Sequence, residues 1–306
     1  MPGALFHLLG LPVTAYALGM AASLLLSAAL LLLCAGRAGI PPKTAETFLL
    51  LALPLGLIAA RLDYVLVRLP FFLGRGDGLA FRFWQGGTTL WGALAGFLLA
   101  ARLSARLEHM ETGRLLDAFA PAGLTLLALG RFCEGLAGQG FGEEALPQLS
   151  FFPFAVPNEW GEWRWAVFLL SGLAALLFIL PVLRAKGLQP GGRARLALIL
   201  VCAFQILFES FREDEFLRWG FVRAGQIIPA GILLLVMLFG LYGRNRGRWQ
   251  GPPHQALAVF VMLTLVAAAC EYALDKTAIS ALLIYLVMLL AALGMYALAR
   301  HAALEA

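Results

Sequence analysis

Three arginines lie inside long apolar runs or at their ends, where a charge needs a specific reason: Arg61, Arg131 and Arg212. A charge within a membrane-spanning helix costs roughly 2.5–3.5 kcal/mol on insertion scales. A guanidinium group donates paired hydrogen bonds that match phosphate oxygens, and a low dielectric strengthens them. Three such arginines at one depth predict an anion pocket. For a single arginine, an ion pair or extension toward the lipid headgroups is the favoured explanation, whereas three together favour the pocket.

Two carboxylates stand about one helical turn from these arginines. Glu134 follows Arg131 by three residues, and Glu209 precedes Arg212 by three. This spacing allows ion pairs within a helix. A carboxyl group in an apolar site is also a candidate general base, because burial disfavours its charged form. The same residues therefore suit either a structural pair or acid–base chemistry.

A glycine-rich turn, from Phe83 to Gly87, precedes an apolar run that begins near residue 88. Backbone N–H groups at the start of a helix can hold a phosphate or a carboxylate. The alternative is an ordinary turn, in which Trp84 anchors the chain at the membrane interface.

The cysteines and histidines do not predict a metal site or a disulfide frame. The four cysteines form no Cys-x-x-Cys pair, and the four histidines never stand at ligand spacing. We therefore expect no metal, no cofactor and buried, unreactive thiols.

Membrane-spanning helices must position these residues. Of the 306 residues, 61% are hydrophobic and only 13% are charged, and the mean hydropathy is +0.84. This composition excludes a soluble enzyme and a disordered chain. The sequence predicts an all-α, polytopic membrane helix bundle of about nine transmembrane helices, because nine apolar runs are long enough to cross a bilayer and lack strand alternation. They cover approximately 13–36, 45–69, 88–104, 114–133, 164–184, 194–211, 222–242, 255–272 and 277–299.

The distribution of positive charge orients this bundle. With the N-terminus outside, thirteen Lys and Arg residues fall in inner loops and eight in outer stretches. Cytoplasmic loops usually carry the excess, so we expect an outer N-terminus and a cytoplasmic C-terminus. The first apolar run is expected to be a retained helix rather than a signal peptide. The net charge of +5 reflects these loops, and no basic stretch with interleaved aromatic residues predicts nucleic-acid binding.

The order of motifs resembles the prolipoprotein diacylglyceryl transferase family, from about residue 16 to about residue 242. The motifs occur in family order on the expected helices. They are Tyr16 in Tyr-Ala-Leu-Gly-Met, Arg61-Leu62-Asp63-Tyr64-Val65-Leu66, Trp84-Gln85-Gly86-Gly87, Gly130-Arg131-Phe132, Phe208-Glu209-Ser210-Phe211-Arg212-Glu213 and Ala224-Gly225-Gln226.

The resemblance implies a bacterial cytoplasmic-membrane transferase of lipoprotein biosynthesis. In the family, phosphatidylglycerol donates its diacylglyceryl group to a cysteine thiol of the lipoprotein precursor, and glycerol phosphate leaves. Arg131 and Arg212 would then bind the phosphate and stabilise the leaving group. The expected lipid-binding residues are Tyr16, Arg61, Gln85, Gly86, Gly87, Glu209 and Gln226.

The departures from the family pattern fall in the part that activates the thiol. The family histidine after the Trp-Gln-Gly-Gly turn aligns with Trp91, and a tryptophan cannot accept a proton. Two family asparagines align with Glu134 and Ala137, and the family stretch before the fifth helix is replaced by 160–165. Glu134 is therefore the expected catalytic base, beside Arg131 and Arg212.

The predicted domain organisation has two parts. Residues 1–245 are expected to form the diacylglyceryl-transferase-like core, with seven helices. Residues 246–306 are expected to form an additional C-terminal transmembrane hairpin, in which Glu271, Asp275 and Lys276 have no assigned role.

Three functions compete. The first is a divergent phospholipid-dependent diacylglyceryl transferase of phosphatidylglycerol type, whose acceptor is a lipoprotein or another molecule. The second is a non-catalytic lipid-binding or assembly subunit that docks a membrane partner through the C-terminal hairpin. A small-solute transporter ranks lowest, because no inverted repeat and no pair of broken helices is visible.

Overall fold

The computed structural model describes residues 5–8, 11–75, 78–82, 87–158, 160–213, 218–219, 222–244 and 252–305. Within these ranges, nine helices are long and apolar enough to cross a membrane. The predicted all-α polytopic bundle is thereby confirmed. The chain divides into two compact units, Ala28–Phe119 and Met1–Ser27 with Ala120–Ala306. Helices α1 (Ala15–Arg37) and α5 (Thr112–Leu136) contribute residues to both.

The unit Ala28–Phe119 is built on α2 (Pro42–Val67) and α4 (Leu90–Leu107), which pack against each other. Small residues make a close approach possible, because helix backbones in membranes come together where side chains are short. A Cβ added to Gly96 would lie 2.3 Å from the carbonyl oxygen of Leu55. The buried small residues of α4 recur every four residues: Gly92, Gly96, Ala100 and Ser104.

Two short elements follow α2 in this unit. They are α3 (Leu69–Arg75) and the 3-10 turn η1 (Leu79–Phe81), neither of which the apolar pattern predicts. Thr89 then begins α4 as its N-cap, because its hydroxyl oxygen accepts a hydrogen bond from the backbone N–H of Gly92 at 3.1 Å.

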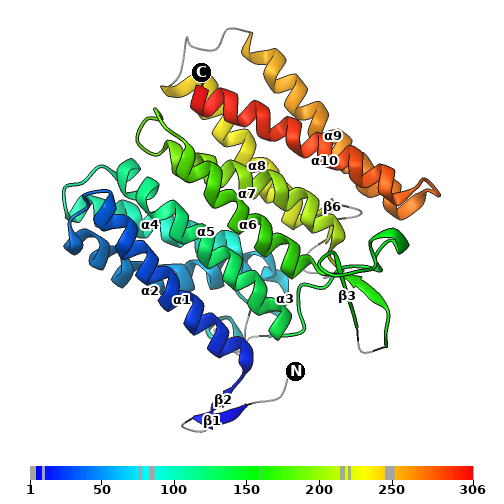
Figure 1. Cartoon of the computed structure of the whole chain (residues 1–306), viewed down its shortest axis with the longest axis horizontal. Coiled ribbons are helices and arrows are strands. Elements are labelled where there is room, and N and C mark those ends of the chain that lie inside the picture. Colours follow the sequence, from blue (N-terminus) through cyan, green and yellow to red (C-terminus); the bar gives the residue numbers. More distant parts are fainter. Residues whose placement is uncertain are drawn as a thin grey trace. The chain divides into compact units, whose positions relative to one another are not determined.

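In the other unit, α7 (Gly192–Phe211) is the central helix. Helices α6 (Val167–Arg184), α8 (Ala224–Leu238) and α10 (Ala281–Arg300) pack against it. Buried residues lie all round α7, among them Leu196, Ala197, Cys202 and Gln205, which is typical of a helix enclosed by neighbours. Figure 1 shows α7 and α8 side by side, with α10 beyond them.

The predicted C-terminal hairpin is present as α9 (Pro253–Lys276) and α10. The two helices pair with each other, and α10 also packs on α7 and α8. Their division from the core as a separate domain stays a prediction. Short π-helical turns extend α8 and α10, namely η4 (Phe239–Arg244) and η5 (His301–Glu305).

Apolar clusters near both ends of α7 hold this hairpin in place. One cluster joins Trp165 and Phe211 to Cys270 of α9 and Met288 of α10. The other joins Leu196 and Leu200 of α7 to Leu124 and Val182, with Tyr296 of α10 packed against it.

Three small antiparallel hairpins complete the described structure: β1 (Phe6–Leu8) with β2 (Leu11–Val13), β3 (Ala155–Pro157) with β4 (Trp163–Trp165), and β5 (Arg218–Trp219) with β6 (Val222–Arg223).

The long acidic connection after α5, which includes the 3-10 turn η3 (Pro147–Leu149), folds back onto β4 and α7. The N–H of Gly142 donates to the carbonyl of Trp165 at 2.8 Å, and that of Glu143 donates to the carbonyl of Phe211 at 2.9 Å. These bonds hold the loop against the C-terminal end of α7.

Candidate active site

The C-terminal part of α5 carries the first ion pair of the candidate site. Arg131, which is 9% exposed, donates from Nη1 to Glu134 Oε1 at 2.7 Å. The two residues are three apart, so their side chains lie on one helix face, as the spacing predicts. A short charge-assisted bond of this kind is among the stronger hydrogen bonds in proteins.

A glutamine links this pair to α7. Arg131 Nη2 donates to Gln205 Oε1 at 3.2 Å, and Gln205 Nε2 donates to Glu209 Oε2 at 2.9 Å. Gln205 is 8% exposed and stands one turn before Glu209. The amide suits this place because it offers an acceptor to a cation and a donor to an anion.

Arg212 joins from the C-terminal end of α7. It is the C-cap residue, with an extended backbone (φ −73°, ψ 143°), and it pairs with Gly142 in an isolated β-bridge. Its Nη1 donates to Glu134 Oε2 at 3.3 Å. The two oxygens of one carboxylate are thus bridged by two guanidinium groups, with Arg131 making the shorter contact.

Two glycines leave room for the carboxylates. A Cβ on Gly140 would lie 2.8 Å from Glu134 Oε2, and a Cβ on Gly225 would lie 2.3 Å from Glu209 Cδ. Gly225 is the second residue of α8, so the Glu209 carboxylate lies beside a helix N-terminus, where the helix dipole favours negative charge.

The four charges of this cluster balance formally, with two guanidinium groups against the Glu134 and Glu209 carboxylates. A guanidinium has five N–H donors, so each arginine can contact a phosphate while it keeps a carboxylate partner. The side chains of Arg212 and Glu134 are 13% and 22% exposed. The arrangement can therefore bind an anion and stabilise charge that develops on it.

Tyr16 lies in the first turn of α1 and is 37% exposed. One turn later, a Cβ on Gly19 would lie 2.8 Å from Cys133 Sγ, and Ser23 contacts the same sulfur at 3.7 Å. This part of α1 therefore packs on the end of α5, next to Glu134.

Gln226 is the third residue of α8 and is buried. Its Nε2 donates to the carbonyl of Ile206 at 3.4 Å and to Ser210 Oγ at 3.3 Å. Residues 206 and 210 lie about 60–140° around α7 from Gln205 and Glu209, at roughly 100° per residue. The structure thus places Gln226 on a neighbouring face of α7 rather than in the arginine cluster.

Arg61 belongs to the unit Ala28–Phe119, where it holds a turn. Its guanidinium donates to the carbonyls of Leu79 at 2.6 Å, Ala80 at 2.9 Å and Gly87 at 3.0 Å. It also lies 5.5 Å from the ring centroid of Tyr64. These contacts fit the alternative in which Arg61 has a structural role rather than binding a phosphate. The convergence of Arg61 with Arg131 and Arg212 in one pocket stays a prediction.

Gly87 is packed closely against the same arginine. Its φ is +76°, and a Cβ would lie 2.6 Å from the Tyr64 ring and 2.7 Å from Arg61 Nη1. Thr89 then donates its hydroxyl to Asp63. Gln85 and Gly86, also predicted as lipid-binding residues, lie outside the described residues, as does Trp84.

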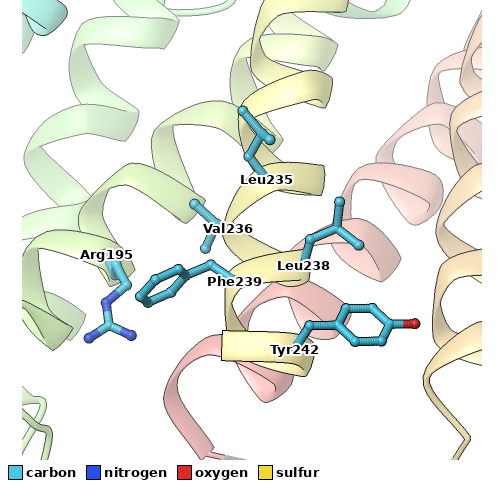
Figure 2. A pocket seen from close by; sticks show the side chains of 6 residues that line it. All are labelled: Arg195, Leu235, Val236, Leu238, Phe239 and Tyr242. Carbon is cyan, nitrogen blue, oxygen red and sulfur yellow. The ribbon is translucent and has the colours of Figure 1, made fainter. Parts of the chain in front are cut away.

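An open groove of about 660 Å³ lies at the other end of α7, lined by Arg195, Leu235, Val236, Leu238, Phe239 and Tyr242. Figure 2 shows the Phe239 ring beside the Arg195 side chain. Arg195 and Arg212 are 17 positions apart along the chain, which is roughly 25 Å at 1.5 Å per helical residue. The groove is therefore separate from the arginine cluster.

Comparison with known proteins bears directly on this cluster. The family model for prolipoprotein diacylglyceryl transferase matches residues 3–242, which include the whole arginine cluster. The chain belongs to the prolipoprotein diacylglyceryl transferase family. The match ends at residue 242, within the turn η4 that follows α8, so α9 and α10 lie beyond it.

Relatives of this family member carry the name phosphatidylglycerol–prolipoprotein diacylglyceryl transferase. One from Streptococcus pneumoniae is 28% identical over 242 residues, covering 76% of this chain and 89% of the relative. One from Listeria innocua is 27% identical over 213 residues, covering 67% and 75%. One from Streptococcus pyogenes is 25% identical over 238 residues, covering 76% and 91%.

Gln205 is the member of the cluster that the sequence analysis did not single out. Its spacing, four residues before Glu209, was an available signal, because side chains at this spacing share a helix face. The contact of Gln205 with Arg131 joins two helices, and no local pattern specifies it.

Proposed function

We propose that this family member is a phosphatidylglycerol-dependent diacylglyceryl transferase of the bacterial inner membrane, acting at the outer face. Its relatives' names specify phosphatidylglycerol and prolipoprotein. The observation that carries the proposal is the bridging of Arg131 and Arg212 by the Glu134 carboxylate. Two guanidinium groups held this way offer paired donors to one lipid phosphate.

In the proposed reaction, the sulfur of an acceptor cysteine attacks the glyceryl carbon that is esterified to phosphate. A carbon–sulfur bond forms as the carbon–oxygen bond breaks, and the electron pair leaves with the phosphate oxygen of glycerol phosphate. Arg131 and Arg212 stabilise the charge that grows on this oxygen. The Glu134 carboxylate takes the thiol proton, because the thiolate is the reactive species.

The proposed setting follows the family and the apolar helices. The chain lies in the membrane with its N-terminus outside and its C-terminus in the cytoplasm, which puts the C-terminal end of α7 at the outer face. In the proposed domain organisation, residues 1–245 act as the transferase core and residues 246–306 as an added hairpin, with a lipoprotein as the acceptor.

Glu134→Gln tests the chemistry, because it removes the ionisable group at nearly constant volume. The purified chain is mixed with phosphatidylglycerol and a cysteine-containing prolipoprotein peptide, and mass spectrometry detects the added diacylglyceryl group. We expect transfer by the unaltered chain and a rate lower by about a hundredfold or more in Glu134→Gln, with lipid binding retained. The matched control is Glu162→Gln in the exposed turn between β3 and β4.

A second candidate function is a non-catalytic lipid-binding or assembly subunit, and one observation favours it. Trp91 occupies the position that aligns with the family histidine, and its ring cannot accept a proton. Phosphatidylglycerol binding without any transfer by the unaltered chain would support this candidate. Transfer that proceeds equally fast in Glu134→Gln would refute Glu134 as the base.

A further inference from the structure

The C-terminal hairpin contributes a buried carboxylate that the proposed reaction does not use. Glu271 lies in α9 and is 4% exposed. Its Oε1 accepts hydrogen bonds from Ser210 Oγ and Gln226 Nε2. An ionisable residue in a membrane-spanning helix calls for a functional explanation with named partners.

These two donors come from helices within residues 3–242, which the family model matches, and both are buried. Ser210 is 3% exposed and lies in the last turn of α7, while Gln226 is 6% exposed in the first turn of α8. Gln226 also accepts from the N–H of Arg223, the N-cap residue of α8, at 3.2 Å. One oxygen of Glu271 thus joins the end of α7 to the beginning of α8.

These two helix ends hold part of the arginine cluster. Ser210 lies between Glu209 and Arg212 in the chain, and Gly225 of α8 packs against the Glu209 carboxylate. Because each helical residue turns by about 100°, a small rotation of the last turn of α7 would redirect both charged side chains. A displacement of about 1 Å at a reacting group can lower a rate a hundredfold.

We propose that Glu271 is a positioning residue of the transferase site, so that the C-terminal hairpin belongs to the active unit. The inference rests on the proposed function. Glu271 faces a cavity of about 170 Å³ that Ser210, Arg223 and Tyr285 also line, and none of Arg131, Glu134 and Arg212 lines it. Glu271 therefore acts on the arginine cluster through α7 and does not touch the lipid phosphate.

The first test compares transfer rates of the full-length chain and its variants. Glu271→Ala removes the shared acceptor, and we expect kcat to fall about tenfold or more, with the KM for phosphatidylglycerol changed less than about threefold. Glu271→Gln keeps a carbonyl oxygen that can accept from both donors, so it is expected to retain most of kcat. The control is Thr264→Val on the same helix, because the Thr264 hydroxyl donates to the carbonyl of Phe260 in α9 at 2.9 Å and contacts Met295 Sδ of α10 at 3.6 Å, away from the ends of α7 and α8.

The second test asks whether Glu271 acts through Ser210. We expect Ser210→Ala to reproduce the loss in Glu271→Ala, and the double variant to be no worse than either one. Losses that multiply would overturn the inference, as would a Glu271→Ala enzyme as active as Thr264→Val. A Glu271→Ala chain that fails to fold is recognised by thermal unfolding, and Ser210→Ala against Thr264→Val then decides the question, because only Ser210→Ala is expected to lose activity.

Amide hydrogen exchange separates this inference from the proposed function, because it does not require activity. Two backbone amides report on the end of α7: the N–H of Arg212, which donates to the backbone carbonyl of Glu209 at 3.2 Å, and the N–H of Glu143, which donates to the backbone carbonyl of Phe211 at 2.9 Å. We expect faster exchange of both in Glu271→Ala and unchanged exchange in Thr264→Val. Faster exchange in a chain without transfer activity would refute the proposed function alone. Unchanged exchange would refute the positioning role.

Discussion

The Glu134 carboxylate forms ion pairs with two arginines, Arg131 and Arg212, which are 81 positions apart in the chain. The spacing of Arg131 and Glu134 on one helix predicts their pairing correctly. The contact of Arg212 with the same carboxylate depends on how α5 and α7 pack, and no local pattern specifies that packing. For the same reason, no local pattern predicts the hydrogen bonds that the Arg61 guanidinium makes to the carbonyls of nearby loops.

Arg212→Lys tests whether transfer needs the planar guanidinium group of Arg212, with its paired hydrogen-bond donors. A lysine keeps the charge but offers a point donor instead of two parallel N–H groups. Loss of such a charge-assisted contact removes about 1.5–3 kcal/mol, which corresponds to roughly a tenfold to hundredfold lower transfer rate, and Arg212→Ala is expected to abolish transfer. Arg193→Lys, at the other end of α7, is the control. A fully active Arg212→Lys enzyme would contradict the phosphate role.

Gln205→Leu tests the bridge between Arg131 and Glu209. The leucine has a similar size but makes neither hydrogen bond, so Arg131 and Glu209 each lose one hydrogen-bond partner. We expect the free energy of unfolding to fall by about 1–3 kcal/mol, measured by denaturant titration in detergent micelles. Gln255→Leu, at an exposed position in α9, should change it little. Equal stability of the two variants would show that the bridge is dispensable.

At the scale of elements, composition and apolar run length predict the nine helices, because a bilayer demands long apolar segments. The run boundaries differ from the helix ends by a few residues, since capping is decided by local hydrogen bonds such as that of Thr89. The short helix α3 and the three small hairpins carry no comparable apolar signal. The sequence therefore predicts the helical spans better than the connections that hold the site.

Gly96→Ala tests the close packing of α2 and α4. The added methyl group would meet the Leu55 carbonyl at 2.3 Å, so the helix backbones must separate. We expect a loss of about 1–3 kcal/mol in the free energy of unfolding. Gly231→Ala in α8 is the matched control, because nothing lies within 4 Å of its Cβ position. It should leave stability unchanged or raise it by about 0.4–1 kcal/mol.

The turn between β3 and β4 should lose order in acid. The hydrogen bond from Arg164, with a further one from Asn158, holds the pKa of the exposed Glu162 below its ordinary value of 4.5. Because the folded pKa is lower than the unfolded one, the pair's contribution is present above pH 4.5 and is lost as pH falls through the folded pKa.

Hydrogen exchange of the Glu162 amide, which donates to Asn158 Oδ1 at 2.9 Å, measures this loss. After correction for intrinsic exchange rates, we expect the protection of this amide in the unaltered chain to decrease at pH values below 4.5. Glu162→Gln should show no such step. A step of the same size in both proteins would assign the effect to another group.

For the whole molecule, the excess of positive charge in alternate loops predicts an outer N-terminus and a cytoplasmic C-terminus. Trp160→Cys places a thiol in the loop between α5 and α6, which is predicted to face outward, and Lys186→Cys places one in the loop between α6 and α7, predicted to face the cytoplasm. A membrane-impermeant maleimide added to spheroplasts should label only the first. Labelling of Lys186→Cys without permeabilisation would reverse the orientation.

The short distance along the chain between Arg131 and Glu134 matters before the protein has folded. Helix α5 leaves the ribosome ahead of α7, so Arg131 must enter the bilayer before Gln205 or Arg212 can reach it. A partner three residues away is present as soon as the helix forms, and the pair can be inserted with its charge already neutralised. Glu134→Gln would leave the Arg131 guanidinium without an opposing charge at that moment, so the amount of inserted protein should fall for reasons unrelated to catalysis. Rates for this variant are therefore meaningful only when expressed per folded molecule.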